Sequence, residues 1–162
     1  SPQEVAVSRE TYPVWTANSG NGTASMIAKD RSVINIKIDI NPGSVAVFSK
    51  GSQAFFAGPK DKILVMVDMR DGQSTTKIVK MSGIGADVKG MATTPDDRGV
   101  IVVHPDLHAI GIFDGKVMRL QALVKVPALP VRCLVTDDNT FVLAICQKGK
   151  ALSVIEMRSV FP

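Results

Sequence analysis

The sequence predicts an all-β protein of the β-propeller class, with about four blades of four antiparallel strands each. Three similar segments begin at Val45, Val88 and Val131, each 43 residues after the one before, and a looser copy begins at Val5. A repeat of about 40–45 residues made of short strands and turns is typical of propeller blades. No segment of helix length has apolar residues with a clean 3.6-residue period, which argues against a mainly helical fold.

The first two repeats each contain four short segments whose composition predicts strands. In the N-terminal copy these segments are Val5–Val7, Val14–Ala17, Thr23–Ala28 and Val33–Ile38. In the second repeat they are Val45–Phe48, Gln53–Ala57, Ile63–Val67 and Thr76–Met81. Asn18–Gly22 and Asp68–Gly72 are predicted turns, because Gly accepts positive φ and Asn or Asp side chains bond nearby backbone amides.

The last two repeats follow the same order of strands and turns. The third predicts strands at Val88–Thr93, Val100–Val103, Ala109–Phe113 and Val117–Val124. Helix propensity is reasonable in the last of these, but its place in the repeat predicts a strand. The fourth repeat supplies three strands, at Val131–Val135, Phe141–Cys146 and Ala151–Met157. Several strands are apolar throughout, so both faces of their sheets need cover, which stacked blades provide.

The turns and third strands carry a resemblance to a known family. The turn at Thr93–Gly99 has the pattern x-x-Pro-Asp-Asp-x-Gly, with a looser analogue at Asp137–Thr140. Three apolar third strands end in an acid, at Ile63–Asp68, Ile110–Asp114 and Leu152–Glu156. The unit resembles a blade of the WD-repeat propellers, with the family's Trp-Asp and Gly-His pairs absent. The resemblance implies a platform for protein interactions, usually without catalysis.

The repeats give the expected domain organisation. We expect one propeller segment over residues 1–162, with blades at 1–40, 41–83, 84–126 and 127–162. Three arrangements fit this count: part of a longer propeller, a compact four-bladed ring, or two copies that pair into eight blades. We favour a segment of a larger propeller or a half that needs a partner. Ser1–Glu4 could supply the missing outer strand of the last blade.

Composition predicts a protein with its own core and no strong preference for nucleic acid. Of 162 residues, 45% are hydrophobic, but the longest apolar runs, such as Phe141–Cys146, are too short to span a bilayer. No secretory signal is visible, so we expect a cytoplasmic protein without a transmembrane segment. Lys and Arg number 19 against 15 Asp and Glu, a mild excess spread along the chain rather than gathered in a basic tail.

The residues that could carry redox or metal chemistry do not form a recognisable site. Cys133 and Cys146 lie on one predicted hairpin, on the same side and diagonal to each other, which predicts reduced thiols rather than a disulfide. His104 and His108 have the i, i+4 spacing of helical metal ligands, but Pro105 predicts a turn there and no further ligand is near. We therefore expect no metal and no cofactor.

The remaining patterns also argue against an enzyme. Asn18–Gly22 and Gly83–Ala86 lack the Lys-Ser/Thr ending of a phosphate-binding loop. The acid pairs Asp96-Asp97 and Asp137-Asp138 lie in predicted turns, where two neighbouring carboxylates share one environment and cannot divide acid and base roles. No Ser, His and Asp set can be assembled from the spacing of these residues.

Loop charges give the best candidate contact surface. In a propeller, the loops between second and third strands share one rim, and these loops are basic here. The candidate partner-binding residues are Lys60, Lys62, His104, His108, Lys148 and Lys150. They predict a non-catalytic scaffold that binds a partner protein, which could be a second copy or the rest of a longer propeller. The alternative is a binder of RNA or acidic lipid headgroups that uses the same residues.

Overall fold

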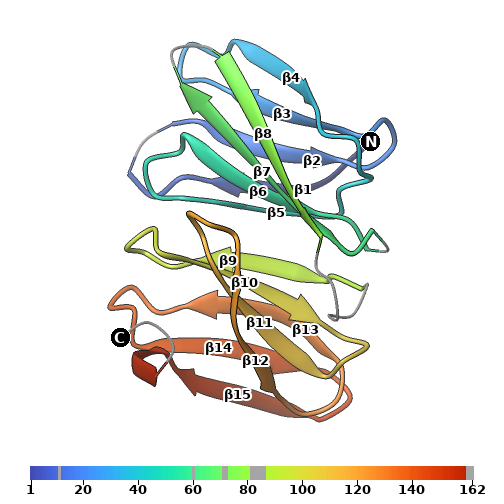
Figure 1. The fold of residues 1–162 in the computed structure, drawn as a ribbon, viewed down its shortest axis with the longest axis vertical. Helices are drawn as coiled ribbons and strands as arrows, with labels where there is room; N and C mark the ends of the chain where they lie inside the picture. The colour runs from blue at the N-terminus through green and yellow to red at the C-terminus, as the bar shows by residue number, and fades with distance from the viewer. Residues whose placement is uncertain (11, 60, 71–72, 81–86, 160–162) are drawn as a thin grey trace. The chain divides into compact units, whose positions relative to one another are not determined.

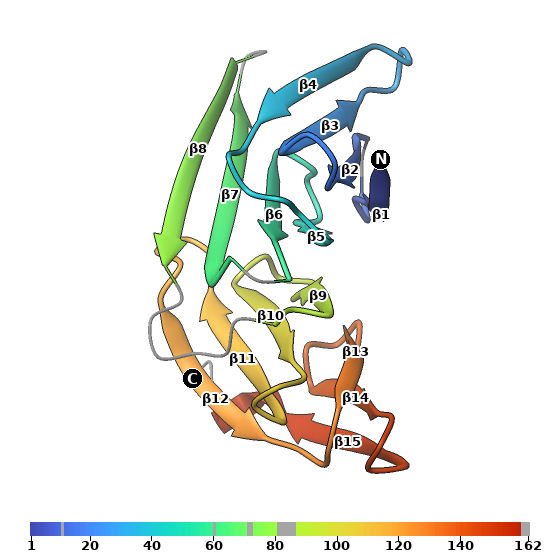
Figure 2. The same ribbon diagram turned by 90° about the vertical axis from the view of Figure 1, so that its right-hand side faces the viewer.

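The predicted all-β propeller class is confirmed. The computed structural model describes residues 1–10, 12–59, 61–70, 73–80 and 87–159. In these residues the regular structure consists of fifteen strands and one 3₁₀ helix, Met157–Ser159, and the strands form four antiparallel sheets in chain order (Figure 1). Every strand pairs with the next one along the chain within its sheet (Figure 2), which is the meander of a propeller blade.

The chain divides into two compact units, Ser1–Gly83 (unit 1) and Ile84–Pro162 (unit 2). Unit 1 contains sheets 1 and 2, with four strands each. Sheet 1 consists of β1 (Pro2–Val7), β2 (Val14–Asn18), β3 (Thr23–Ile27) and β4 (Val33–Lys37). Sheet 2 consists of β5 (Ser44–Val47), β6 (Gln53–Ala57), β7 (Ile63–Arg70) and β8 (Gln73–Lys80).

Unit 2 contains sheets 3 and 4. Sheet 3 consists of β9 (Gly90–Thr93), β10 (Gly99–His104), β11 (Ala109–Asp114) and β12 (Leu120–Lys125). Sheet 4 consists of β13 (Pro130–Val135), β14 (Phe141–Cys146) and β15 (Ala151–Glu156). Each of the four sheets lies inside one of the residue ranges expected for a blade. Sheet 4 has three strands among the described residues, as the fourth repeat predicts.

The expectation that Ser1–Glu4 completes the last blade is wrong. Residues Pro2–Val7 form β1, which pairs with β2 in sheet 1, and the Ser1 carbonyl accepts the N–H of Ser19 at 3.1 Å. The Glu4 carboxylate also accepts the backbone N–H of Val45 at 2.9 Å, which ties β1 to sheet 2. A hairpin with β2 closes a far shorter loop than pairing with the last sheet would, and so costs less chain entropy.

The turn hydrogen bonds show which residues of sheets 3 and 4 are equivalent. Thr94 and Thr136 hold the same place in sheets 3 and 4: their backbone N–H groups donate to Gly99 and Phe141, each at 3.0 Å, and their hydroxyls accept from the same two residues' N–H groups. Equivalent residues of the two sheets therefore differ by 42 in number, not by the predicted 43. Since side chains alternate across a strand, this one-residue shift exchanges the faces assigned to them.

Each unit has its own core between two stacked sheets. In unit 1, Trp15 on sheet 1 packs edge-on against Phe56 of sheet 2, with ring centroids 5.9 Å apart, and donates its indole N–H to Gly51 O at 2.9 Å. We call the packed face of sheet 1 its front and that of sheet 2 its back. The core joins Trp15, Ala17, Ala24 and Ile36 of the front to Val45, Val47, Phe56 and Val65 of the back.

Unit 2 repeats this arrangement. The front of sheet 3 packs on the back of sheet 4, and the core joins Ile101, Val103, Ile110 and Ile112 to Val135, Val142 and Ala144. The opposite faces of sheets 2 and 3 also carry buried side chains, including Phe55 and Leu64 of sheet 2 and Val102 and Phe113 of sheet 3. Burial of both faces is what the apolar composition of these strands predicts.

Candidate interaction surfaces

The turn between β10 and β11 fixes His108 at the edge of unit 2. His108 is exposed and has φ of 49°, the left-handed region, which closes the turn after Pro105. Its carbonyl accepts the N–H of Val126 at 2.9 Å, and its Nδ1 accepts the N–H of Leu129 at 3.2 Å. His108 therefore holds the β12–β13 connection in place, in addition to being available on the surface.

The turn between β14 and β15 presents two of the predicted lysines. Lys148 and Lys150 are both exposed. Gly149 between them donates its N–H to Ala128 O at 2.9 Å, and a side-chain carbon at Gly149 would lie 2.5 Å from Pro127 Cβ. Only glycine permits this close approach, so the loop that carries the two lysines is fixed against the β12–β13 connection.

A third lysine at this edge was not predicted. Lys125, the last residue of β12, is exposed, and its Nζ donates to Leu107 O at 3.0 Å. The sequence analysis missed it because the predicted fourth strand, Val117–Val124, stops one residue earlier. The strand begins later than predicted because the Asp114 carboxylate caps a turn, accepting the N–H groups of Lys116 and Val117 at 2.9 Å each. We call Lys125, Lys148 and Lys150 the basic rim of unit 2.

The two contact residues predicted in unit 1, Lys60 and Lys62, are less well supported by the structure. Lys60 lies outside the described residues. Lys62 is exposed, with φ of 50°. Its neighbour Asp61 carries the opposite charge, and the Asp61 carboxylate accepts the N–H of Asn41 at 3.3 Å. Among the described residues of this loop, the positive charge of Lys62 therefore has the negative charge of Asp61 beside it in the chain.

His104 is not a loop-tip residue, and its assignment to a contact surface is wrong. It ends β10, pairs with Ala109 and is fully buried, because Pro105 to His108 suffice to make the turn. Neither ring nitrogen has a hydrogen-bond partner among the described residues. Burial lowers the pKa of His104 below 6.5 and outweighs the raising effect of the Asp106 charge, so the ring is neutral at pH 7.

The acid pairs are turn formers, as predicted. The Asp138 carboxylate accepts the Thr136 hydroxyl at 2.6 Å and the Thr140 N–H at 2.9 Å. These bonds to its charged form lower the pKa of Asp138 to about 2. Asp96 likewise accepts the N–H of Arg98, at 3.2 Å. The carboxylates are therefore engaged in local structure rather than directed at a common cleft.

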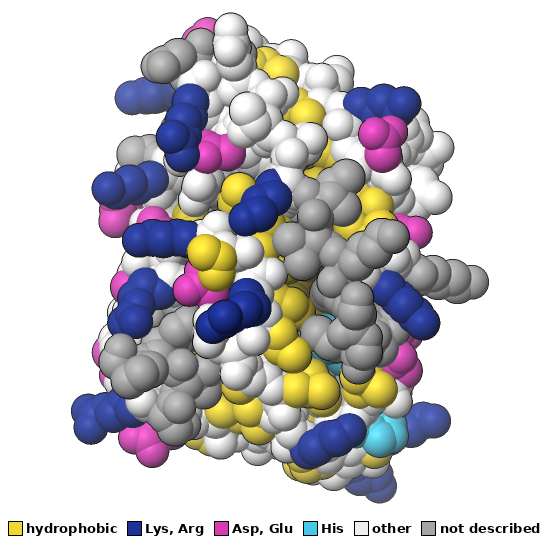
Figure 3. Space-filling view, in the orientation of Figure 1, with side chains coloured by type: hydrophobic (Ala, Val, Ile, Leu, Met, Phe, Trp, Pro, Cys, Tyr) yellow, Lys and Arg dark blue, Asp and Glu magenta, His cyan; other side chains and the backbone are white. Residues whose placement is uncertain are grey.

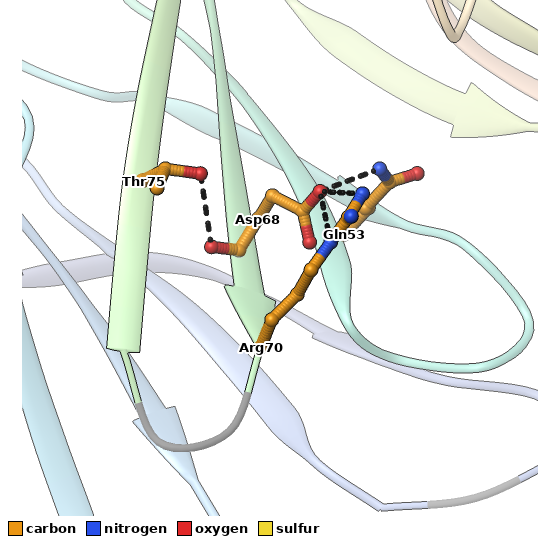
Figure 4. A network of polar contacts seen from close by, with 4 residues as sticks. All are labelled: Gln53, Asp68, Arg70 and Thr75. Atoms are coloured by element: carbon orange, nitrogen blue, oxygen red, sulfur yellow. Dashed lines mark hydrogen bonds and ion pairs between the residues drawn. The ribbon is translucent and has the colours of Figure 1, made fainter.

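A polar network lies at the end of β7 (Figure 4). One carboxylate oxygen of buried Asp68 accepts from Gln53 Nε2 at 3.0 Å and from Arg70 Nε and Nη2 at 3.1 and 2.8 Å. The Thr75 hydroxyl donates to Asp68 O at 3.5 Å. Burial raises the pKa of Asp68, but the bonds from Arg70 and Gln53 outweigh it, so the pKa is lowered. The acid that ends this third strand is thus a structural tie between β6, β7 and β8.

A further hollow in unit 1 was not predicted. Two open cavities, of 340 and 780 Å³, both include Tyr12 and Lys29 in their walls. Tyr12 is 57% exposed, and Lys50 and Arg9 lie at the margins. The sequence gives little warning of this hollow, because it is formed by the β1–β2 loop with loops of the next sheet.

Metal and membrane features can be stated for the described part of the chain. No group of three or more His, Cys, Asp or Glu side chains there is placed to hold a metal ion. None of the described residues belongs to a helix long and apolar enough to cross a membrane. Cys133 and Cys146 are free thiols, and Cys133 pairs with Ala144 as predicted. On the face shown in Figure 3, Lys and Arg side chains are scattered rather than gathered in one patch.

Comparisons with known proteins identify the fold and no family. No family model matches the chain, and no curated protein matches its sequence. Among solved structures 982 chains match, so the fold is common and does not single out a function. One of them is hydrazine synthase of Kuenenia stuttgartiensis, with a TM-score of 0.83 and 17% identity over 98% of this chain. This chain spans 46% of that protein's length, and the likeness places it in the β-propeller fold.

Proposed function

We propose that the chain is a non-catalytic scaffold that binds an acidic surface of a partner protein through the basic rim of unit 2. The observation that carries the proposal is the placement of Lys125 at the end of β12 and of Lys148 and Lys150 on the β14–β15 turn, which backbone hydrogen bonds tie to the β12–β13 connection. A backbone that is already held in place loses less entropy on binding than a mobile loop, which favours specific docking. The WD-repeat resemblance supports the same role.

Chemistry at the surface supports a binding role over catalysis. The described carboxylates near the turns are used as caps, and His104 is buried away from the surface. A basic patch steers an acidic partner toward it and raises the rate of association. A cytoplasmic location is part of the proposal, and the placement of Cys133 and Cys146 diagonal to each other in one sheet without a disulfide fits a reducing compartment.

The test compares two double charge reversals in unit 2. K148E/K150E reverses the rim, whereas K116E/R119E makes the same change in net charge at the β11–β12 turn, at the other end of sheet 3. Proteins that bind the wild type are expected not to bind K148E/K150E and to bind K116E/R119E as they bind the wild type. Equal binding by both variants would remove the rim from the proposal, provided that circular dichroism shows both to be folded.

A polyanion is the alternative ligand for the same three lysines. Single-stranded RNA and vesicles with anionic lipid are the probes, each titrated between 50 and 200 mM salt. Contacts with several phosphates would reduce affinity by orders of magnitude over this range, because each releases condensed counterions. A rim of only three lysines favours the weaker salt dependence of a protein partner, and a steep loss of affinity would instead favour the polyanion.

A further inference from the structure

Sheet 4 exposes an apolar face of its own. On this front face Phe141 is 37% exposed, and four other apolar side chains are 52–60% exposed: Leu134, Ile145, Leu152 and Val154. By register, the exposed Arg132 and Glu156 stand at the margin of the same face. Leu143 lies between them, paired with both Leu134 and Val154. Six large apolar side chains on one sheet face exceed what scattered surface residues produce, and such a patch marks an interaction surface.

The same positions in sheet 3 are known to accept a neighbouring sheet. Because equivalent residues differ by 42 in number, Leu143, Ile145, Leu152 and Val154 stand where Ile101, Val103, Ile110 and Ile112 stand in sheet 3. Those four residues are fully buried in the core of unit 2, where they pack on the back of sheet 4. The front of sheet 4 is therefore built to receive the back of another sheet.

The chain itself carries a matching back that is uncovered. Sheet 1 packs its front on sheet 2, while on its back Val5, Val7 and Val33 are 61%, 64% and 56% exposed. The strand pairing makes Val7, Val14 and Ile27 equivalent to Val135, Val142 and Ile155 on the back of sheet 4, and Ser25 equivalent to Ser153. All four equivalent pairs are identical residues. The back of sheet 1 thus repeats four of the side chains on the back of sheet 4, whereas Thr16 and Asn18 stand where sheet 4 has Ala144 and Cys146.

The polar side chains on the back of sheet 1 can be covered at little cost in hydrogen bonding. Asn18 Nδ2 donates to Ser25 Oγ at 2.8 Å, Ser25 Oγ donates to Asn35 Oδ1 at 2.6 Å, and Thr16 Oγ1 donates to Asn18 Oδ1 at 3.2 Å. These side chains are bonded to one another before any partner arrives. Covering them would not leave the bonded atoms unpaired, which is the usual cost of burying polar groups.

We propose that the front of sheet 4 docks on the back of sheet 1 in a second copy of this chain. The contact is head to tail, because it joins two different faces, and the proposed dimer uses one front and one back from each copy. The repeat identifies a second copy as the partner, because the contact between copies would be equivalent to the contact that already joins the front of sheet 3 to the back of sheet 4. The surface is separate from the basic rim, so the two proposals stand independently.

The test uses charged substitutions on exposed positions of each face. L152K/V154K disrupts the front of sheet 4, V5K/V7K disrupts the back of sheet 1, and V117K, at an exposed valine in the β11–β12 turn, is the control. Sedimentation equilibrium at micromolar to ~100 µM concentrations measures the mass, which brackets the affinities of most specific dimers. The wild type and V117K are expected to be dimers, and each double variant a monomer with unchanged circular dichroism.

Mixing the two double variants identifies the faces. The V5K/V7K variant keeps an intact front and the L152K/V154K variant an intact back, so an equimolar mixture is expected to form a 1:1 pair through one contact. A dimer that V5K/V7K leaves intact would overturn the proposal in favour of two sheet 4 fronts packed together. A wild type that is monomeric throughout would overturn it as well and assign the face to a different partner. K148E/K150E should leave the mass of the wild-type assembly unchanged. The self-association test therefore does not depend on whether the basic rim binds a partner protein.

Discussion

At the scale of single residues, buried polar groups determine how stability responds to charge and pH. Asp68 and His104 are both almost fully buried, yet their partners differ. Asp68 keeps its charge because Arg70 and Gln53 donate to it, whereas His104 stays neutral because burial disfavours its charged form. Each contributes to stability in a pH window that follows from the direction of its pKa.

Replacing Asp68 tests the network at the end of β7. We expect D68N to lower the free energy of unfolding by about 1–3 kcal/mol, because charge-assisted bonds from Arg70 become weaker neutral ones at a buried site. D39N is the control: Asp39 pairs with Lys37 at 3.1 Å, but both side chains are largely exposed, so the change should stay within about 0.5 kcal/mol. Urea unfolding measures both. Equal effects would show that the buried network adds nothing beyond a surface pair.

His104 predicts a loss of stability in mild acid. Its folded pKa lies below 6.5, so stability is complete above about pH 6.5 and falls as pH drops toward the folded pKa, since the unfolded chain binds the proton first. Between pH 7.5 and 5.5 we expect a loss of at most about 1.4 kcal/mol, because the unfolded pKa of 6.5 lies one unit above pH 5.5 and each unit corresponds to 1.36 kcal/mol. H104Q should remove that loss, and H108Q, which replaces an exposed ring, should retain it. Urea unfolding followed by circular dichroism at the two pH values would decide between them.

At the scale of elements, the turns determine which side chains reach the surface. The turn residues Asp96, Asp138 and Gly149 were recognisable from sequence, because caps and close approaches need these residue types. Lys148 and Lys150 were found for that reason. His104 was misplaced because its neighbours in sequence resemble a loop, although the pairing of β10 with β11 continues through it. Lys125 was missed through an error of one residue in the end of a strand.

The glycine between the two rim lysines provides a test at this scale. In G149A the new methyl group would lie 2.5 Å from Pro127 Cβ and 3.1 Å from Ala128 N, so the β14–β15 turn must shift. We expect a destabilisation of about 1–3 kcal/mol, typical of overpacking, together with weaker binding through the basic rim. G90A is the control, since its nearest contact would be an ordinary 3.4 Å to Val131 O. Thermal unfolding of both variants measures the difference, and a G149A transition equal to that of G90A would contradict the close-packing argument.

At the scale of the whole molecule, the sequence predicted the fold class and the number of sheets, and missed how they are grouped. The period was visible because each sheet buries the same alternating apolar residues. The division after Gly83 was not, because sheets on either side of it share one pattern. The register error of one residue between sheets 3 and 4 mattered most: it hid the fact that Leu143 and Ile145, rather than Ala144 and Cys146, lie on the uncovered face.

The indole of Trp15 has a practical consequence for studying the two units. It is the chain's single tryptophan, and the single tyrosine, Tyr12, is also in unit 1. Tryptophan fluorescence, excited at wavelengths that phenylalanine does not absorb, therefore reports on Ser1–Gly83 alone. Emission that shifts at a different denaturant concentration from the far-ultraviolet signal would reveal that the halves melt separately, without any label being attached.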